Sequence, residues 1–290
     1  MKAMKVLLFV AAALLCAAVF SSGAGAAGLT LYANPPGGLP CGFPSVVGIQ
    51  NAVNSATAGD TVFVCPGVYH EQVTITKPLT LTGSSAVIQP AVLLGDMNVV
   101  DVTGATTSVV MSGFTVAGPG PSGCNSIHTG IYVNGGASLD LSNTTVRDIQ
   151  DTPFSGCQNG EGIRVGTARG SATPDVGHAT IDNVIVTHYQ KNGIVVAGSN
   201  STGKITNTTV TGVGRTPVIA QNGVEVVNGA AATVSTTTMR DNFYTGTQNV
   251  KACGLLIIAA SGVNDDKTDV YLNDQQNKCT VTGRGGTYQG

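Results

Sequence analysis

Gly162-Ile163-Arg164-Val165 and, one period later, Gly193-Ile194-Val195-Val196 show the pattern that decides the fold: a glycine, an apolar residue, a variable residue and a second apolar residue. Copies of this pattern begin at Val99, Gly130, Gly162, Gly193, Gly223 and Gly254, and only the first copy lacks the glycine. Successive copies start 31, 32, 31, 30 and 31 residues apart. A fixed period of this length indicates stacked units, each too small to bury its own apolar face.

Each period also contains a second, two-part strand signal that is broken by one residue. In three successive periods the break carries Asn143, Asn183 and Asn207, and in two others Gly113 and Thr236. Asn and Gly tolerate the left-handed backbone of a sharp bend. The unit therefore consists of a strand, a loop, a strand, a one-residue bend, a strand and a loop. Three short strands in each turn predict an all-β parallel β-helix.

Other folds fit this pattern less well. A β-sandwich has hairpin turns and no constant register, a leucine-rich repeat has a spacing that this chain lacks, and a helical solenoid requires a 3.6-residue periodicity. The one segment with helical spacing carries Val46, Ile49, Ala52, Val53 and Ala56 on one face. We expect this short helix to cover the apolar N-terminal end of the solenoid, as a terminal cap must.

The beginning of the chain has the pattern of an export signal. Lys2 and Lys5 precede the apolar run 6–20, and the small residues 24–26 fit a cleavage site. We therefore divide the chain into a signal peptide (1–26), an N-terminal segment with the capping helix (27–60) and the parallel β-helix (61–290). The apolar run is too short for a membrane span, so we expect a secreted, extracellular protein with no membrane partner. The net charge of −2 argues against nucleic acid as a partner.

The cysteines support an oxidising compartment. Seven are present, and six remain once Cys16 is removed with the signal peptide. Six cysteines permit fifteen sets of three disulfides, but the repeat favours one set. Cys124 and Cys157 precede consecutive repeat glycines by six and five residues, which places them about 4.8 Å apart in stacked coils. A Cys41–Cys65 bridge would pin the cap to the first coil, and Cys253–Cys279 then remains for the last coil.

Several motifs near the cap resemble a known family. They are Ile49-Gln50-Asn51-Ala52-Val53, Ala58-Gly59-Asp60-Thr61, Pro66-Gly67-Val68-Tyr69 and Lys77-Pro78-Leu79-Thr80-Leu81-Thr82-Gly83. Together with the repeats, they resemble the right-handed β-helix proteins of the pectin-lyase-like superfamily over about residues 40 to 280. The resemblance implies a right-handed coil and a secreted life near polysaccharides. It implies no single activity, because the superfamily holds lyases, hydrolases, esterases, epimerases and non-catalytic members.

The catalytic motifs of this superfamily are incomplete here. The run Gly67 to Glu71 matches a pectin methylesterase segment, but the catalytic Asp motifs and the Arg-Pro-Trp segment of those enzymes are missing. The Asn-Thr-Asp and Gly-His-Gly signatures of polygalacturonases are absent too. Arg215-Thr216-Pro217 matches the start of a pectate-lyase Arg-x-Pro-x-x-Arg motif, whose second arginine is Ala220 here. We therefore carry over no catalytic residue of the family.

The outward face of the Gly-initiated strands is a candidate substrate groove. The residues beside the third position are apolar and point inward, so the third position points outward. This outward ladder consists of Asp101, Tyr132, Arg164, Val195, Glu225 and Leu256. In the superfamily, this face borders the substrate groove. Asp101 and Glu225 lie four rungs apart, ~19 Å at the spacing of strands, whereas a glycosidase carboxylate pair needs about 5–10 Å.

The loops before these strands carry a charged cluster. Asp148 and His188 occupy equivalent positions, so we expect them one rung apart, and we expect Glu161 near Lys191 with Arg164 at the border. A base, an acid and cations within reach of one another suit proton abstraction or sugar hydrolysis. We therefore name Asp148, Glu161, Arg164, His188 and Lys191 as candidate catalytic residues. The alternative is that these charges pair with each other and solvate the loops.

Candidates for substrate binding lie along the same edge: Tyr132, Phe154, Tyr189, Glu225, Phe243 and Tyr244. Their aromatic rings either stack on sugar rings or pack the loops onto the coils.

We predict no cofactor or metal. Asn264, Asp265, Asp266 and Asp269 offer oxygen ligands of the kind that calcium prefers, but no full binding-loop motif is present. A solvated turn is the favoured interpretation of this segment. The histidines His70, His128 and His178 are too scattered in the sequence for a zinc site.

The sequence thus predicts a secreted, monomeric β-helix protein that binds extracellular polysaccharide, with an acidic cell-wall glycan favoured. Two hypotheses remain open for its activity. The protein cleaves the glycan as a polysaccharide lyase or a glycoside hydrolase, or it is a non-catalytic surface or matrix protein that acts in adhesion.

Overall fold

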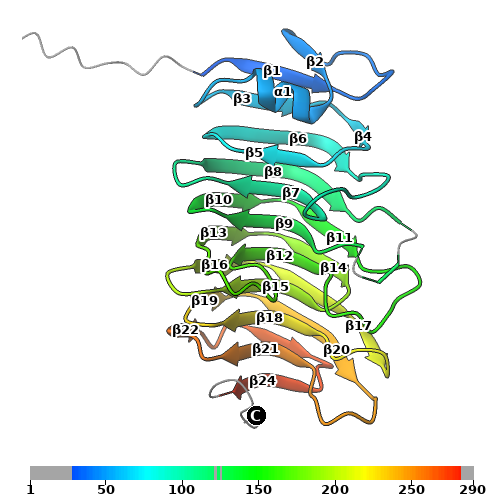
Figure 1. Cartoon of the computed structure of the whole chain (residues 1–290), viewed down its shortest axis with the longest axis vertical. Helices are drawn as coiled ribbons and strands as arrows, with labels where there is room; N and C mark the ends of the chain where they lie inside the picture. Colours follow the sequence, from blue (N-terminus) through cyan, green and yellow to red (C-terminus); the bar gives the residue numbers. More distant parts are fainter. Residues whose placement is uncertain (1–27, 121–122, 125, 282–290) are drawn as a thin grey trace, which may run out of the picture.

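The chain winds into a stack of coils in which strands of successive coils pair in parallel (Figure 1). A computed structural model describes residues 28–120, 123–124 and 126–281, and the predicted signal peptide (1–26) lies outside them. The predicted parallel β-helix is confirmed. Within the described residues, no helix is long and apolar enough to cross a membrane.

One wall of the coil is an eight-stranded sheet with the order β5–β7–β9–β12–β15–β18–β21–β24. Its strands are β5 (Val73–Ile75), β7 (Asn98–Thr103), β9 (Thr129–Asn134), β12 (Glu161–Gly166), β15 (Asn192–Ala197), β18 (Asn222–Val227), β21 (Cys253–Ile258) and β24 (Gln276–Val281). The copies of the repeat pattern that begin at Val99 and at the five repeat glycines all lie in this sheet. The repeat period is therefore the length of chain that leads from one of its strands to the next.

The other sheet has sixteen strands and forms two sides of the coil. The strands before the bend are β10 (Ala137–Ser142), β13 (Gly177–Asp182), β16 (Thr202–Thr206), β19 (Ala231–Ser235) and β22 (Gly262–Asp265). Those after the bend are β11 (Thr145–Ile149), β14 (Ile185–Tyr189), β17 (Thr209–Thr216), β20 (Thr238–Tyr244) and β23 (Val270–Leu272). The long strands β6 (Leu79–Ile88) and β8 (Ser108–Ala117) extend along both sides, and β1 (Thr30–Asn34), β2 (Ser45–Val47), β3 (Thr61–Val64) and β4 (Gly67–Tyr69) complete the sheet near the N-terminal end.

The predicted one-residue bend separates the two sides of this sheet. Gly113, Asn143, Asn183, Asn207 and Thr236 all have a positive φ, between 48° and 81°. The asparagines also link neighbouring coils, because Asn183 Nδ2 donates to Asn143 Oδ1 at 2.7 Å. A left-handed backbone costs an ordinary L-residue about 1–2 kcal/mol. This cost explains why Asn or Gly recurs at the bend.

The core is a set of apolar ladders inside the coil. For example, one inward position is occupied by Ile131, Ile163, Ile194, Val224 and Leu255 in successive coils, and each of these residues is 0% exposed. Each side chain is covered by its neighbours above and below, so only the ends of the stack require a cap.

The helix α1 (Ile49–Ser55) provides the N-terminal cap and buries Ile49, Ala52 and Val53. It is shorter than the sequence spacing predicts, because Gly48, with φ 87°, lies between strand β2 and the helix. The carboxylate of Glu71 accepts hydrogen bonds from the backbone N–H of Ile49 (2.7 Å) and of Gln50 (2.9 Å). An acidic group at this position satisfies N–H groups that the helix leaves free.

The three predicted disulfides are confirmed. Cys41–Cys65, Cys124–Cys157 and Cys253–Cys279 have Cα–Cα distances of 5.8, 5.7 and 6.0 Å. The first bridge joins the β1–β2 loop to the end of β3, and the last joins β21 to β24.

The bend supplies a stability test at Asn183, which is exposed and has a φ of 53°. Asn183→Val should lower the free energy of unfolding by about 1–2 kcal/mol, because a β-branched residue is strained in this conformation. Asn183→Gly should lower it much less, since glycine adopts a positive φ readily. Chemical denaturation of the two variants and of Thr180→Val, a strand control, measures the difference. Equal losses for Val and Gly at position 183 would contradict a left-handed bend.

Candidate functional site

The predicted outward ladder follows the outer face of the eight-stranded sheet. Backbone pairing places its members opposite one another in successive strands: Asp101, Tyr132, Arg164, Val195, Glu225 and Leu256. Loops cover the middle of this ladder, so that Arg164 is 6% and Glu225 is 8% exposed. Charged side chains are seldom covered so deeply unless they are paired. The ladder and its covering loops form the candidate site.

Three cavities over the ladder share Arg169, and the two larger ones form the candidate site. The acidic cavity, of about 470 Å³, is lined by residues that include Asp96, Asp101, Tyr132, Glu161, Arg164, Arg169 and Asp175. The basic cavity, of about 390 Å³, is lined by residues that include Gln158, Arg169, Lys191, Glu225, Tyr244 and Lys251. The lining of the basic cavity thus carries three cations and one carboxylate.

Glu161, at the start of β12, is neutralised by two arginines. Its Oε2 lies 2.5 Å from Nη1 of Arg164, and its Oε1 lies 3.5 Å from Nη1 of Arg169. Arg164 also donates from Nε to the carbonyl of Thr167 at 2.6 Å. The Glu161–Arg164 ion pair is buried, which makes it costly to break. Together with the hydrogen bond from Arg164 to Thr167, this ion pair holds the start of the β12–β13 loop and thereby positions Arg169 between the two cavities.

Lys191 lies immediately before β15 and faces the basic cavity. Its Nζ donates a hydrogen bond to the carbonyl of Ala220 at 2.7 Å, which fixes the ammonium group against the β17–β18 loop. Burial lowers the pKa of Lys191 to about 8, although Glu225 acts in the opposite direction. A lysine with a pKa of about 8 is a neutral amine in about a tenth of the molecules at pH 7.

Glu225 lies in β18, and its carboxylate accepts no hydrogen bond from any described residue. Burial raises the pKa of Glu225, and the negative charge of Glu161 raises it further, whereas Arg169 and Lys191 lower it. The site therefore disfavours the charged form of both Glu225 and Lys191. Perturbed groups that share a cavity mark a candidate functional site.

The acidic cavity contains a second perturbed carboxyl group. Burial raises the pKa of Asp101 to about 6, against an ordinary value of 3.8. Its Oδ1 accepts a hydrogen bond from Nδ2 of Asn134 at 2.6 Å. Tyr132 lines the same cavity and is partly exposed, so its ring is available to a ligand.

The predicted catalytic cluster is divided by the structure. Asp148 and His188 lie one rung apart as expected, with His188 Nδ1 3.3 Å from Asp148 Oδ1. They belong to β11 and β14 of the sixteen-stranded sheet, however, and neither lines the acidic or the basic cavity. Glu161, Arg164 and Lys191 lie in or beside the eight-stranded sheet. The expectation that all five meet needs correction, because the chain passes from one sheet to the other between Asp148 and Glu161.

The predicted aromatic residues also separate. Tyr244 lines the basic cavity, although it is only 6% exposed, and Phe243 lies beneath the guanidinium of Arg215, 3.9 Å from its Cζ. Phe154 is partly exposed in the β11–β12 loop and lines neither cavity.

The ring of Tyr189 points into the core, contrary to the expectation that it contacts a sugar. The side chain is 0% exposed in the core, and its hydroxyl donates to Asn242 Oδ1 at 2.5 Å. The preceding residue, His188, has a φ of 50°. A left-handed residue interrupts the alternation of inward and outward side chains, and Tyr189 consequently points inward.

Four further residues of the site were not predicted. Arg169 and Lys251 lie in loops outside the repeat, where the sequence offers no positional signal. Asn192 and Asn222 form a buried ladder with Glu161, in which Asn222 Nδ2 donates to Asn192 Oδ1 at 2.9 Å. The sequence contains a pattern that marks this ladder, because Glu161, Asn192 and Asn222 each directly precede a repeat glycine.

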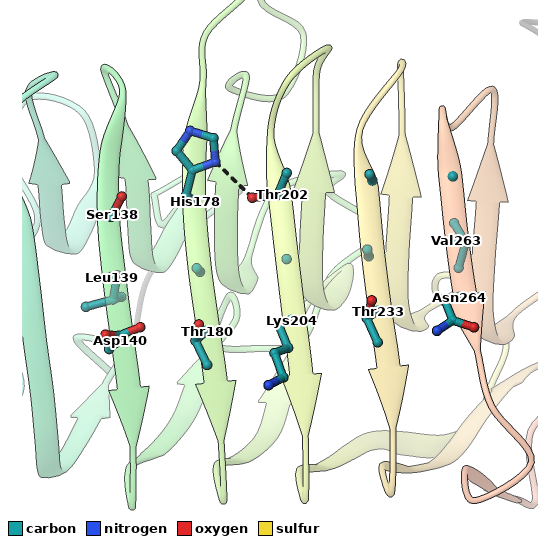
Figure 2. A pocket seen from close by; sticks show the side chains of 15 residues that line it. Ser138, Leu139, Asp140, His178, Thr180, Thr202, Lys204, Thr233, Val263 and Asn264 are labelled. Atoms are coloured by element: carbon teal, nitrogen blue, oxygen red, sulfur yellow. Dashed lines mark hydrogen bonds between the residues drawn. The ribbon is translucent and has the colours of Figure 1, made fainter.

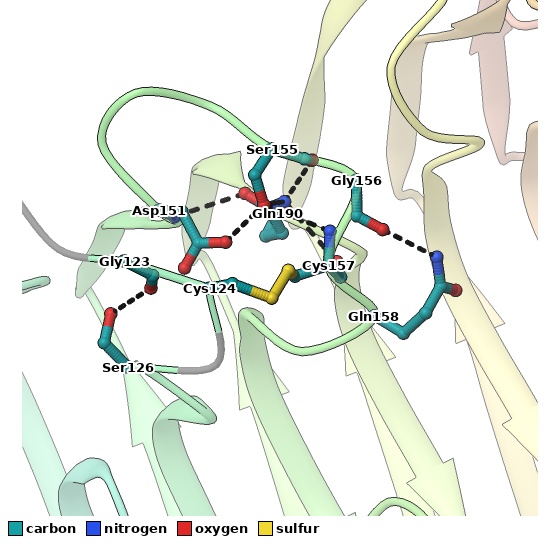
Figure 3. The surroundings of a disulfide bond; sticks show 9 residues. All are labelled: Gly123, Cys124, Ser126, Asp151, Ser155, Gly156, Cys157, Gln158 and Gln190. Carbon is teal, nitrogen blue, oxygen red and sulfur yellow. Dashed lines mark hydrogen bonds between the residues drawn. A yellow bond between two sulfur atoms is a disulfide. The ribbon is translucent and has the colours of Figure 1, made fainter.

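The β11–β12 loop, which supplies Gln158 to the basic cavity, is fastened at several points (Figure 3). Cys157 is bonded to Cys124, and Gln190 Nε2 donates to Ser155 Oγ at 3.0 Å. The buried carboxylate of Asp151 lies near the two sulfur atoms. Because these sulfurs are bonded to each other, they are not available as metal ligands.

The acidic segment considered for calcium is engaged by protein donors. Asp265 accepts hydrogen bonds from the Tyr271 hydroxyl (3.0 Å) and from Lys278 Nζ (3.1 Å). Asp269 accepts one from the backbone N–H of Thr237 at 2.7 Å. The other carboxylate oxygen of Asp269 is buried and accepts no hydrogen bond from a described residue.

A larger but shallower groove of about 760 Å³ lies on the other sheet, over β10, β13, β16, β19 and β22 (Figure 2). His178 Nδ1 and Thr202 Oγ1 are 2.8 Å apart there. Asp140 and Lys204, which also line it, are exposed. This groove lacks the buried ionisable groups that distinguish the basic cavity.

Comparison with solved structures identifies the fold. No protein-family model and no curated protein matches the sequence. Among solved structures, pectate lyase Pel9A aligns with a TM-score of 0.51 at 14% identity, covering 89% of this chain and 77% of that one. XylC in complex with xylose aligns with a TM-score of 0.50 at 10% identity, covering 90% and 73%. The chain is a right-handed parallel β-helix.

The perturbed carboxyl group of Asp101 predicts a pH effect on stability. Between about pH 4 and pH 6 the folded protein retains a proton that the unfolded chain releases, so this group makes stability fall as the pH rises through that window. Asp101→Asn removes the titration and should raise the free energy of unfolding at pH 7 by about 1–2 kcal/mol. Chemical denaturation of wild type and Asp101→Asn at several pH values from 4 to 7 measures the difference in their free energy of unfolding. Asp140→Asn, which changes an exposed carboxylate, is the control. A difference between wild type and Asp101→Asn that does not change with pH would contradict the assignment.

Proposed function

We propose that this protein binds a uronate-containing polysaccharide along the outer face of the eight-stranded sheet and cleaves it by β-elimination. The composition of the basic cavity carries this proposal. Arg169 and Lys251 carry positive charge there, whereas burial favours the neutral forms of Lys191 and Glu225, so the cavity attracts an anionic ligand. The fold shared with a pectate lyase and with a protein that binds xylose supports a carbohydrate ligand.

The cavity residues divide the work of such a reaction. The guanidinium of Arg169 and the ammonium of Lys251 are suited to hold the carboxylate of a uronate unit. Neutral Lys191 is suited to remove the proton from the carbon that bears this carboxylate, because a base with a pKa near the working pH is the most effective. Positive charge beside the carboxylate stabilises the negative charge that develops as the proton leaves.

Elimination is favoured over hydrolysis by the state of the carboxyl groups. Glycoside hydrolysis commonly uses two carboxyl groups on either side of the bond. Glu161 is held between Arg164 and Arg169, and Glu225 is the one carboxyl group among the residues that line the basic cavity. A lysine base and one carboxyl group suit elimination better.

We also propose that the protein acts outside the cell. Three disulfides join its coils, and disulfides persist in oxidising compartments. This location agrees with the signal peptide expected from the sequence, and polysaccharides of the cell surface are accessible there.

The activity is tested with purified protein and a panel of polyuronates and neutral polysaccharides. We expect the ultraviolet absorbance of a new carbon–carbon double bond with at least one polyuronate and with no neutral glycan. New reducing ends without this absorbance would contradict elimination. Binding without any product would instead support a non-catalytic role in adhesion.

Arg169 supplies a sharper test of ligand charge. Arg169→Gln should raise KM for the polyuronate at least about tenfold, because a charge-assisted hydrogen bond is worth about 1.5–3 kcal/mol. Arg147→Gln is the matched control, since Arg147 contacts Asp148 on the other sheet. Equal KM values for Arg169→Gln and Arg147→Gln would contradict a role of the basic cavity in binding.

A further inference from the structure

Glu225 has a largely buried carboxyl group that accepts no hydrogen bond from the described residues and opens into the basic cavity. Its neighbours along the outward ladder are Val195 and Leu256, which are 1% and 4% exposed. It is therefore flanked by apolar side chains on both sides, while its own side chain lines the basic cavity. A largely buried carboxyl group that opens into a cavity is placed to hydrogen-bond a ligand there.

The charged groups around Glu225 come from neighbouring coils. Glu161 and Arg164 lie in β12, Arg169 in the loop that follows, and Lys191 immediately before β15. Glu161 is paired with both arginines, and the ammonium of Lys191 donates to Ala220. None of these cations forms an ion pair within 4.0 Å of the Glu225 carboxylate in the described part of the chain. The carboxyl group is therefore free to face a ligand.

We propose that Glu225 is the catalytic acid that protonates the departing glycosidic oxygen, opposite Lys191 as the base. This inference rests on the proposed function. Lys191 Nζ takes the proton from the carbon that bears the carboxylate, and the electron pair of that bond forms a carbon–carbon double bond. The bond from the adjacent carbon to the glycosidic oxygen breaks, and that oxygen takes the proton of the Glu225 carboxyl group. The Glu225 carboxylate and the Lys191 ammonium then exchange protons with water.

The burial of the two groups decides which is the acid and which the base. Burial favours the neutral form of each group, which is a protonated carboxyl group for Glu225 and a free amine for Lys191, although Arg169 and Lys191 act against it at Glu225 and Glu225 acts against it at Lys191. The neutral carboxyl group has a proton to donate, and the free amine has a lone pair to accept one. The reverse assignment requires both groups to react from the charged forms that burial disfavours.

A leaving-group experiment tests this assignment. Glu225→Gln keeps the shape of the protonated acid but has no proton to transfer. On a polyuronate, its kcat should fall about 10²–10⁴-fold with little change in KM. On a synthetic uronide that eliminates nitrophenolate, which leaves without protonation, Glu225→Gln should stay within about tenfold of wild type. Lys191→Met should lose activity on both substrates, and Asp140→Asn, an exposed carboxylate on the other sheet, should match wild type.

Other outcomes of this experiment would overturn either the acid role of Glu225 or the proposed function. Full activity of Glu225→Gln on the polyuronate, or equal loss on both substrates with unchanged thermal unfolding, overturns the acid role. Rescue of Lys191→Met, rather than Glu225→Gln, by the nitrophenyl substrate reverses the two roles and also overturns it. If wild type produces no double bond from either substrate, the proposed function itself fails. Thermal unfolding of Glu225→Gln at or above the wild-type temperature shows that loss of activity is not loss of fold.

Discussion

The parallel register between successive coils is the constraint on which the rest of this structure depends. Each inward apolar residue is covered by its equivalents one coil away, so the register is fixed by burial of the whole ladder. The same register fixes the outward ladder. It aligns Arg164, Val195 and Glu225 on consecutive strands, and it brings Glu161, Asn192 and Asn222 into one buried row. A site that draws residues from three coils is possible only because these coils cannot slip.

A rigid scaffold also explains how buried charges are tolerated. The charge of Glu161 is compensated by Arg164 and Arg169. These ion pairs hold the β12–β13 loop in place. Lys191 and Glu225 are less well compensated, and burial shifts the pKa of each toward the neutral form. Groups held in this state lower stability locally, and proteins retain such groups mainly at functional sites. The contrast between Glu161, which is paired, and Glu225, which is unpaired among the described residues, supports the proposed chemical role of Glu225.

Much of this architecture could be predicted from the sequence. The repeat gave the ladder positions, and the recurrence of Asn143, Asn183 and Asn207 gave the bend, because a left-handed backbone restricts the choice of residue. The position of Cys124 and Cys157 relative to the repeat glycines gave their bridge. In each case, a structural requirement that recurs from coil to coil produces a residue pattern that recurs in the sequence.

The errors arise where the period is interrupted. The left-handed backbone at His188 turns Tyr189 into the core, and alternation within a strand gives no warning of this. Arg169 and Lys251 enter the site from loops of irregular length, which no repeat constrains.

The most direct test of the account is a crystal structure of Lys191→Met with a bound oligouronate. The account predicts a glycan chain that crosses β12, β15 and β18 over the basic cavity, with one carboxylate at Arg169 and its glycosidic oxygen beside Glu225. A glycan bound instead over β13 and β16, beside Lys204, would contradict it.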